Sequence, residues 1–190
     1  MAVIINASTS TGLVQSADTS GIIQFQSNGS TKATLNSSGF SYPGGVLQVV
    51  QGTTNTTTTV SANTYTDTTL SASITPTSSS SKILVLINQQ SVVSVYAGPN
   101  GLGLRLLRGS TPIFDPSPLD GAGSPFLIYG TAVSGIFTTV SFSYLDSPAT
   151  TSSTTYKTQG RPYDSSLSSS IFQNGVTKAT STITLLEIAA

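Results

Sequence analysis

The sequence contains no cysteine and no histidine. Without cysteine the chain cannot form a disulfide, and without either residue it cannot build a thiolate or imidazole metal site. The absence of histidine also excludes a Ser-His-Asp triad, so the abundance of serine does not indicate catalysis. We therefore expect no metal and no cofactor, and we expect that the protein is not an enzyme.

Charged residues are scarce as well. Lys and Arg total 7 and Asp and Glu total 7, so the net charge is zero and charged residues make up 7% of the chain, where a typical soluble domain carries about 25%. The basic residues are dispersed and form no electrostatic footprint for nucleic acid. Ser and Thr supply about a third of the 190 residues. Such a neutral hydroxyl surface is typical of a rigid β structure or of a part of a large assembly.

Long apolar runs are missing too. The longest unbroken aliphatic run, ILVLI at 83–87, is far shorter than the ~20 residues that a membrane-spanning helix needs. The first residues, MAVIINASTS, lack the basic region and long apolar stretch of a signal peptide. We expect no membrane insertion. Hydrophobic residues nevertheless make up 37% of the chain, which is enough for a buried core and argues against disorder.

The first 45 residues divide into an arm and a hairpin. Residues 1–20 open apolar and turn polar, which predicts an extended arm; the alternative is a first strand of the main domain. In residues 21–45, apolar and polar residues alternate with the period of a β-strand on both sides of Asn28-Gly29. Asn-Gly favours a type I′ hairpin turn, which needs positive φ at both positions. The hairpin would gather Ile23, Phe25, Ala33 and Leu35 on one face.

A lone hairpin is at best marginally stable in water, so this apolar face needs a partner. The strand followed by SNGSTKATLNSSGF resembles the repeat of bacteriophage tail-fibre and neck proteins, in which three chains wind into a shaft. The resemblance implies that Ile23, Phe25, Ala33 and Leu35 lie at a trimer interface. One copy is present here, whereas long shafts carry many. The YPGG segment at 42–45 reads as a hinge and domain boundary.

Residues 46–190 predict an all-β domain. Short strands recur at roughly ten-residue spacing with turn signals between them, which indicates an antiparallel sandwich or jelly roll. KILVLINQQSVVSVYA predicts a central buried strand. The glycine-rich stretch at 99–103 predicts a turn, and no window of ten or more residues shows a capped helical period.

This domain carries a second resemblance. YTDTTLSASITPTSSSSKILVLI, LRLLRGST, YLDSPATTSSTTYKTQGR and STITLLEI resemble the C-terminal jelly-roll domain of virion structural proteins from marine and cyanobacterial phages, and more distantly the trimeric knobs of tumour-necrosis-factor type. The resemblance implies a trimeric β-rich component of a virion, either a fibre knob or a capsid decoration.

The acidic residues were considered as catalytic or metal-binding candidates. Asp115 and Asp120 lie in the Pro/Gly-rich stretch TPIFDPSPLDGAGSP, where they could serve a glycosidase or bind calcium. Local turn hydrogen bonding is the favoured interpretation for both, and also for Asp146 and Asp164. Glu187 lies in an apolar strand, where it would either pair with a basic residue or face solvent.

One polar segment is a candidate for sugar binding. YKTQGRPYDSS would bring Tyr156, Arg161, Tyr163 and Asp164 into one loop, and a tyrosine ring suits a sugar face. The alternative is a solvated loop anchored by one buried tyrosine.

The sequence therefore favours a homotrimeric phage fibre or knob, located in the virion and attached to other virion proteins through residues 1–20. As a fibre it would contact host surface glycans. The alternatives are a capsid decoration or head-fibre protein, a monomeric carbohydrate-binding module, and a depolymerase that uses Asp115 and Asp120.

Overall fold

The computed structural model describes residues 20–37, 39–60, 64–95, 98–115, 127–130, 133–162, 170–173 and 179–190. The chain forms two compact units, Met1–Gly45 and Val46–Ala190. The division falls at the YPGG segment, where the sequence places the hinge. Within the described residues the regular structure is entirely β, as predicted, and no helix there could cross a membrane. Of the predicted arm, residues 1–19 lie outside the described residues.

The first unit, which we call the neck, is a three-stranded antiparallel sheet in the order β1-β2-β3. Its strands are β1 (Ile23–Ser27), β2 (Ser30–Asn36) and β3 (Gly39–Ser41). Asn28 and Gly29 have φ of 50° and 73°, so the predicted type I′ geometry is confirmed. β3 was not expected, because its three residues are too few to show a strand period.

The second unit, which we call the head, is a sandwich of two antiparallel sheets. One sheet has the order β10-β8-β12-β6, with β9 beside β8; the other has the order β4-β14-β7-β13-β5, with β11 beside β7. The bounds are β4 (Val46–Thr54), β5 (Thr58–Val60), β6 (Thr66–Ile74), β7 (Lys82–Val95), β8 (Gly98–Arg108), β9 (Thr111–Phe114), β10 (Leu127–Gly130), β11 (Val133–Asp146), β12 (Thr154–Pro162), β13 (Ser170–Phe172) and β14 (Ser181–Ile188).

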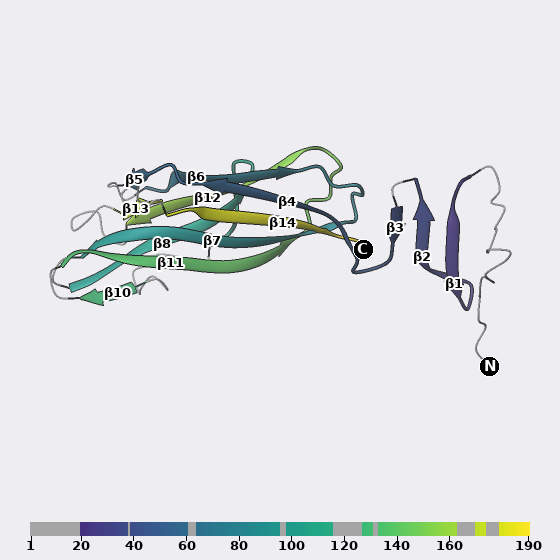
Figure 1. Ribbon diagram of the computed structural model, residues 1–190, viewed down its shortest axis with the longest axis horizontal. Coiled ribbons are helices and arrows are strands. Elements are labelled where there is room, and N and C mark those ends of the chain that lie inside the picture. Colours follow the sequence, from purple (N-terminus) through teal and green to yellow (C-terminus); the bar gives the residue numbers. More distant parts are fainter. Residues whose placement is uncertain are drawn as a thin grey trace, which may run out of the picture. The chain divides into compact units, whose positions relative to one another are not determined.

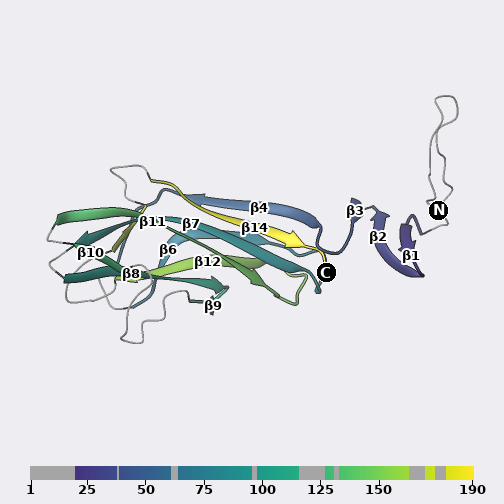
Figure 2. The same cartoon turned by 90° about the horizontal axis from the view of Figure 1, so that it is seen from below.

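The long strands of the head alternate between the two sheets along the chain. β6, β8 and β12 belong to the five-stranded sheet, and β7, β11 and β14 belong to the six-stranded sheet. Figure 1 shows the strands running along the length of the sandwich, and Figure 2 shows the layer of β4 and β14 apart from that of β12 and β8. Crossing between layers at each step is the connectivity of a jelly roll. The predicted antiparallel β-sandwich is confirmed.

The turn predicted at 99–103 is wrong. These residues belong to β8, in which Pro99 and Gly101 pair with β10 and Gly103 pairs with Arg161 of β12. The glycines and the proline suggested a turn because they are poor strand formers. Partners that are distant in the sequence nevertheless hold this stretch extended.

The core lies between the inward faces of the two sheets. β7 is central, as predicted, since it pairs with β14 on one side and with β11 on the other. Only alternate residues of β7 are buried, however, so the strand is buried on one face and not on both. The largest side chains of the core are those of Tyr156, Phe172, Leu70, Ile74, Ile83, Leu102, Leu104, Leu106, Ile183 and Leu185.

A polar belt crosses this core. Thr158 Oγ1 donates to Gln89 Oε1 over 2.9 Å, and Gln89 Nε2 donates to Ser181 Oγ over 3.1 Å. All three residues are fully buried. Buried polar groups of this kind are costly when unpaired, so the belt favours the one arrangement of the sheets that satisfies it.

Glu187 is one of two buried carboxylates among the described residues of the head, the other being Asp146. It lies on the inward face of β14 and is fully buried. Gln48 Nε2 donates to Oε2 over 2.6 Å, while the backbone N–H and Oγ1 of Thr77 donate to Oε1 over 2.7 and 2.8 Å. Glu187 thus links β4, β14 and the β6–β7 turn. Both sequence expectations for Glu187 are wrong: its side chain does not face solvent, and among the described residues its partners are neutral groups rather than a basic side chain.

We predict that Glu187 makes stability depend on pH. Burial raises its pKa, but hydrogen bonds from Gln48 and Thr77 outweigh burial and hold the pKa below its ordinary value of 4.5. A depressed folded pKa contributes stability that is present above about pH 4.5 and is lost as pH falls through the folded value. Urea unfolding from pH 7 to pH 3 should show a steeper loss in the wild type than in Glu187→Gln. Parallel pH profiles would contradict this.

We also predict that Gly52→Ala destabilises the head. A Cβ at Gly52 of β4 would collide with the backbone carbonyl of Ser71 and lie 3.1 Å from Ala72 Cβ. Because the obstacle is backbone rather than a flexible side chain, we expect a loss of about 1–3 kcal/mol in urea unfolding. Thr53→Ala, at the exposed neighbouring position of β4, is the control. Equal unfolding midpoints for the two variants would count against this packing.

Candidate functional site

The outward face of the six-stranded sheet carries an apolar row across four strands. Val49 of β4 is paired with Leu186 of β14, Leu186 with Leu84 of β7, and Leu84 with Leu145 of β11. Val49 is 58% exposed and Leu145 50% exposed. Four consecutive strands therefore present one continuous line of aliphatic side chains on the outside of the head.

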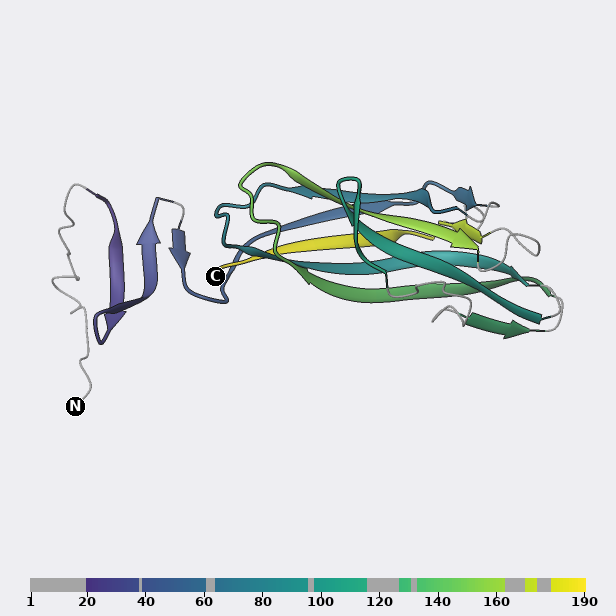
Figure 3. The same cartoon turned by 180° about the vertical axis from the view of Figure 1, so that it is seen from behind.

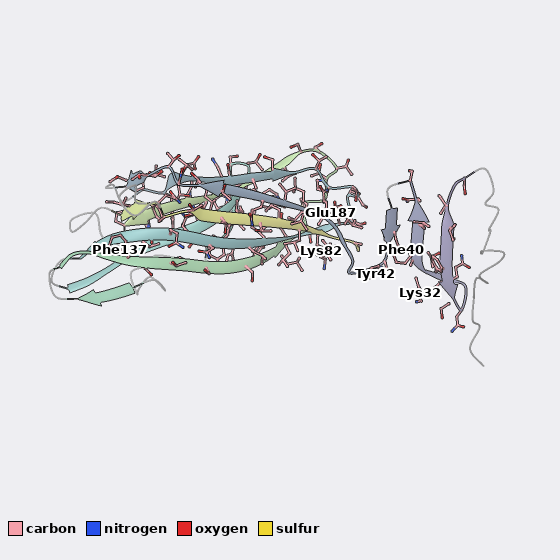
Figure 4. The ribbon with its side chains drawn as sticks, viewed as in Figure 1. Lys32, Phe40, Tyr42, Lys82, Phe137 and Glu187 are labelled. Atoms are coloured by element: carbon pink, nitrogen blue, oxygen red, sulfur yellow. The ribbon has the colours of Figure 1, made fainter. Side chains whose placement is uncertain are left out.

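The neighbouring rows define how far this apolar face extends. On one side Val46 is paired with Ile188, and Ile188 with Lys82. On the other side Leu86 is 41% exposed and lies between Thr184 and Ser143. Figure 4 places Lys82 near the end of β14 and Phe137 toward the opposite end of β11. We call the set Val46, Val49, Leu84, Leu86, Leu145, Leu186 and Ile188 the sheet-face patch.

The neck carries a second exposed apolar face. Ile23 is paired with Leu35 and Leu35 with Phe40, while Phe25 is paired with Ala33. The four residues predicted for the trimer interface thus share one face, and Phe40 of β3 extends it. The rings of Phe25 and Phe40 meet edge to face at 5.7 Å. Phe25 is 47% and Phe40 55% exposed, so the described strands of the neck leave this face largely uncovered.

The outward face of the five-stranded sheet is different in character, because it gathers charge. Arg105 of β8 is paired with Gln159 of β12, and Gln159 with Asp67 of β6. The Arg105 and Arg161 guanidinium carbons lie 4.1 and 5.1 Å from the centroid of the Tyr65 ring. Figure 3 shows this side of the molecule, where β12 (light green) runs beside β8 (teal).

Hydrogen bonds hold these side chains in two groups, which the contacts of Arg105 and Arg161 with the Tyr65 ring join into one network. Tyr65 Oη donates to Asp115 Oδ2 over 3.0 Å. Nε and Nη2 of Arg105 donate to Gln159 Oε1 over 3.0 and 2.6 Å, and Gln159 Nε2 donates to Asp67 Oδ1 over 2.6 Å. Lys157 Nζ completes the network with an ion pair to Asp67 Oδ2 at 2.7 Å. We call Tyr65, Asp67, Arg105, Asp115, Lys157, Gln159 and Arg161 the arginine–tyrosine cluster.

The cluster shifts the titration of two of its members. Burial raises the pKa of Tyr65, and the charge of Asp115 and its hydrogen bond raise it further, against the opposing effect of the two arginines. Burial alone would raise the pKa of Asp67, but hydrogen bonds from Lys157 and Gln159 outweigh it and lower the pKa. Both groups therefore keep one protonation state near neutral pH, Tyr65 neutral and Asp67 charged.

The loop predicted for sugar binding is not assembled as expected. Tyr156 and Arg161 lie in β12, and Tyr156 is fully buried, so its ring cannot meet a ligand. Tyr156 Oη donates to Asp146 Oδ2 over 2.7 Å, and Arg108 Nη1 forms an ion pair with the same oxygen at 2.9 Å. The expectation of a loop at these two positions is wrong because β12 pairs with both β6 and β8. Tyr163 and Asp164 lie outside the described residues.

The remaining acidic candidates have structural partners or lie elsewhere. Asp146 was expected to serve a local turn, but it is buried and holds Arg108 and Tyr156, so that interpretation is wrong. Asp115 accepts from Tyr65, while its proposed partner Asp120 lies outside the described residues. Within the described part of the chain, no group of three or more acidic side chains could hold a metal ion.

Sequence reasoning missed most residues of the sheet-face patch and of the arginine–tyrosine cluster. Leu84 and Leu86 were treated as core, because a continuous aliphatic run does not reveal which face remains open. Arg105 is one of the dispersed basic residues, and no local pattern marks it or Tyr65 as part of a site. No protein-family model matches the chain, and no curated protein matches it. The surfaces therefore have to be interpreted from their own chemistry.

We predict that Tyr156 stabilises the head through its hydroxyl. Tyr156→Phe removes the donor to Asp146 and leaves a buried carboxylate with one partner fewer, which should cost about 1–3 kcal/mol in urea unfolding. Tyr144→Phe is the matched control, because the Tyr144 hydroxyl has no hydrogen bond within the described residues while its ring stacks on Phe114 at 5.0 Å. Equal stability of the two variants would mean that the Asp146 contact contributes nothing.

Proposed function

We propose that the protein is a structural component of a bacteriophage virion, a homotrimeric fibre or knob attached to the particle through its N-terminal arm. The observation that carries the proposal is the presence of exposed apolar faces on both units, the neck face and the sheet-face patch. Exposed apolar patches of this kind mark interaction sites.

Two copies of the same chain are the proposed partners of both faces. Among the described residues of the six-stranded sheet, Lys82 is the one exposed charged side chain beside the patch, so identical chains meet little like-charge repulsion there. The patch begins at Val46, directly after the neck ends at Gly45. Chains that associate along the neck are therefore brought close at the start of the head, which lowers the entropic cost of joining the second face.

Burial of apolar area supplies the energy of the proposed assembly. Each Å² of apolar surface removed from water contributes about 25 cal/mol. The carboxylates are a second argument for a structural role. Asp67, Asp146 and Glu187 are each engaged by hydrogen bonds within the fold.

Light scattering on the purified chain tests the oligomeric state. We expect three times the chain mass of 19.4 kDa. The double variant Phe25→Ser/Leu145→Lys should dissociate toward 19.4 kDa, because it makes both apolar faces polar while its substituted positions are about half exposed in the single chain. The control is Thr34→Ser/Ser73→Lys, which changes the polar face of the neck and the opposite sheet of the head. A monomeric wild type, or dissociation of the control as well, would overturn the proposal.

A capsid decoration or head-fibre protein is the alternative role for the same trimer. Both roles use the same self-associating faces, so oligomeric state does not separate them. Adsorption competition does: isolated protein that blocks phage adsorption indicates a fibre, and protein that leaves adsorption unchanged indicates a decoration.

A further inference from the structure

Charge in this chain is concentrated at one place on the surface. The sequence has 7 basic and 7 acidic residues, and the arginine–tyrosine cluster holds three of the basic ones and two of the acidic ones. These side chains come from β6, β8 and β12 and from the residues that flank β6 and β9. The cluster therefore carries an excess of one positive charge on an otherwise hydroxyl-rich sheet face.

Arg105 forms no ion pair with the described residues. Two other basic side chains do, since Arg108 pairs with Asp146 and Lys157 with Asp67. Arg105 is instead held by the neutral amide oxygen of Gln159, which takes the edge formed by Nε and Nη2. The other edge of the guanidinium, formed by Nη1 and Nη2, receives no acceptor from the described residues. This edge is the planar fork that pairs with a carboxylate.

The fork is held in place before any ligand binds. The Gln159 oxygen fixes one edge of the guanidinium, and the Tyr65 ring supports it at 4.1 Å. Tyr65 is in turn fixed by its hydrogen bond to Asp115. Arg105 is half-buried, so water screens its attraction to a bound anion less than at a fully exposed site. Because the Arg105 side chain is already held in place, little of its conformational entropy is lost on binding.

The surroundings of the fork select among anions. The single open edge of Arg105 offers two parallel N–H donors, which match the two oxygens of one carboxylate. Further along β6 and β12 the outward positions carry exposed hydroxyls: Ser71 is paired with Lys157, and beyond it the oxygens of Ser73 and Thr155 lie 2.7 Å apart. Hydroxyl and amide groups beside a charged fork suit a ligand that has both a carboxylate and hydroxyls.

We propose that the arginine–tyrosine cluster binds carboxylate-bearing sugars, that is, uronic acid units of an acidic polysaccharide. Arg105 takes the carboxylate with its free edge, Arg161 adds positive charge beside it, and the outward hydroxyls of β6 and β12 contact the sugar hydroxyls. The inference deepens the proposed function. It rests on that function only where it names the origin of the polysaccharide, which would belong to a surface that the virion contacts.

Calorimetric titration of the full chain with tetragalacturonate tests the site. We expect that the tetramer binds and that its affinity falls as salt is added. The fully methyl-esterified tetramer, in which the carboxylates are uncharged esters, should bind at least about tenfold more weakly. Arg105→Gln should weaken binding of the acid at least about tenfold. Arg105→Lys should fall between this variant and the wild type, because it keeps the charge and loses the fork. Lys32→Gln removes one positive charge from the exposed face of the neck and should leave the affinity unchanged.

Each outcome is decisive. Absence of binding, equal binding of the ester, or unchanged affinity in Arg105→Gln would overturn the inference; if Arg105→Gln fails to fold, Arg105→Lys and the ester decide. Light scattering on the same samples separates the two proposals. A trimer that does not bind overturns the sugar site alone, whereas a monomer that binds overturns the trimer alone.

Discussion

The alternation of side chains along the strands is the constraint on which the molecule depends. A two-layer sandwich buries the inward face of each sheet, and the aliphatic run at 83–87 is apolar on both faces of β7. Ile83, Val85 and Ile87 enter the core, so Leu84 and Leu86 must point outward. The neighbouring strands place Leu186 and Leu145 beside Leu84. The sheet-face patch is therefore a consequence of strand geometry combined with a sequence that is apolar at successive positions.

The two outer faces of the head differ in a way that suits different partners. The six-stranded sheet presents aliphatic side chains with little charge, which favours a second copy of the same neutral chain. The five-stranded sheet presents arginines ordered by Tyr65 and Gln159, which favours a small anionic ligand. Separating the two surfaces on opposite layers would let the protein assemble through one and keep the other accessible.

The buried polar groups bring together strands that are distant in the sequence. Glu187 connects β14 with β4 and with the β6–β7 turn, and Asp146 connects the end of β11 with β8 and β12. Asp146 was interpreted as a turn residue because Ser147 and Pro148 follow it, whereas Glu187 lies in an apolar strand whose pattern does not reveal a polar partner. Their roles follow instead from partners 10 to 139 positions away.

The sequence by itself determined the features that depend on near neighbours. The period of two predicted an all-β chain, Asn28-Gly29 predicted the hairpin turn, and the apolar face of the neck followed from alternation. Only the tertiary structure decided which strands pair. It placed Tyr156 inside β12, made 99–103 a strand, and set Tyr65 beside Asp115, 50 positions away. Strand pairing joins residues across long separations, so no local pattern reveals which outward side chains become neighbours.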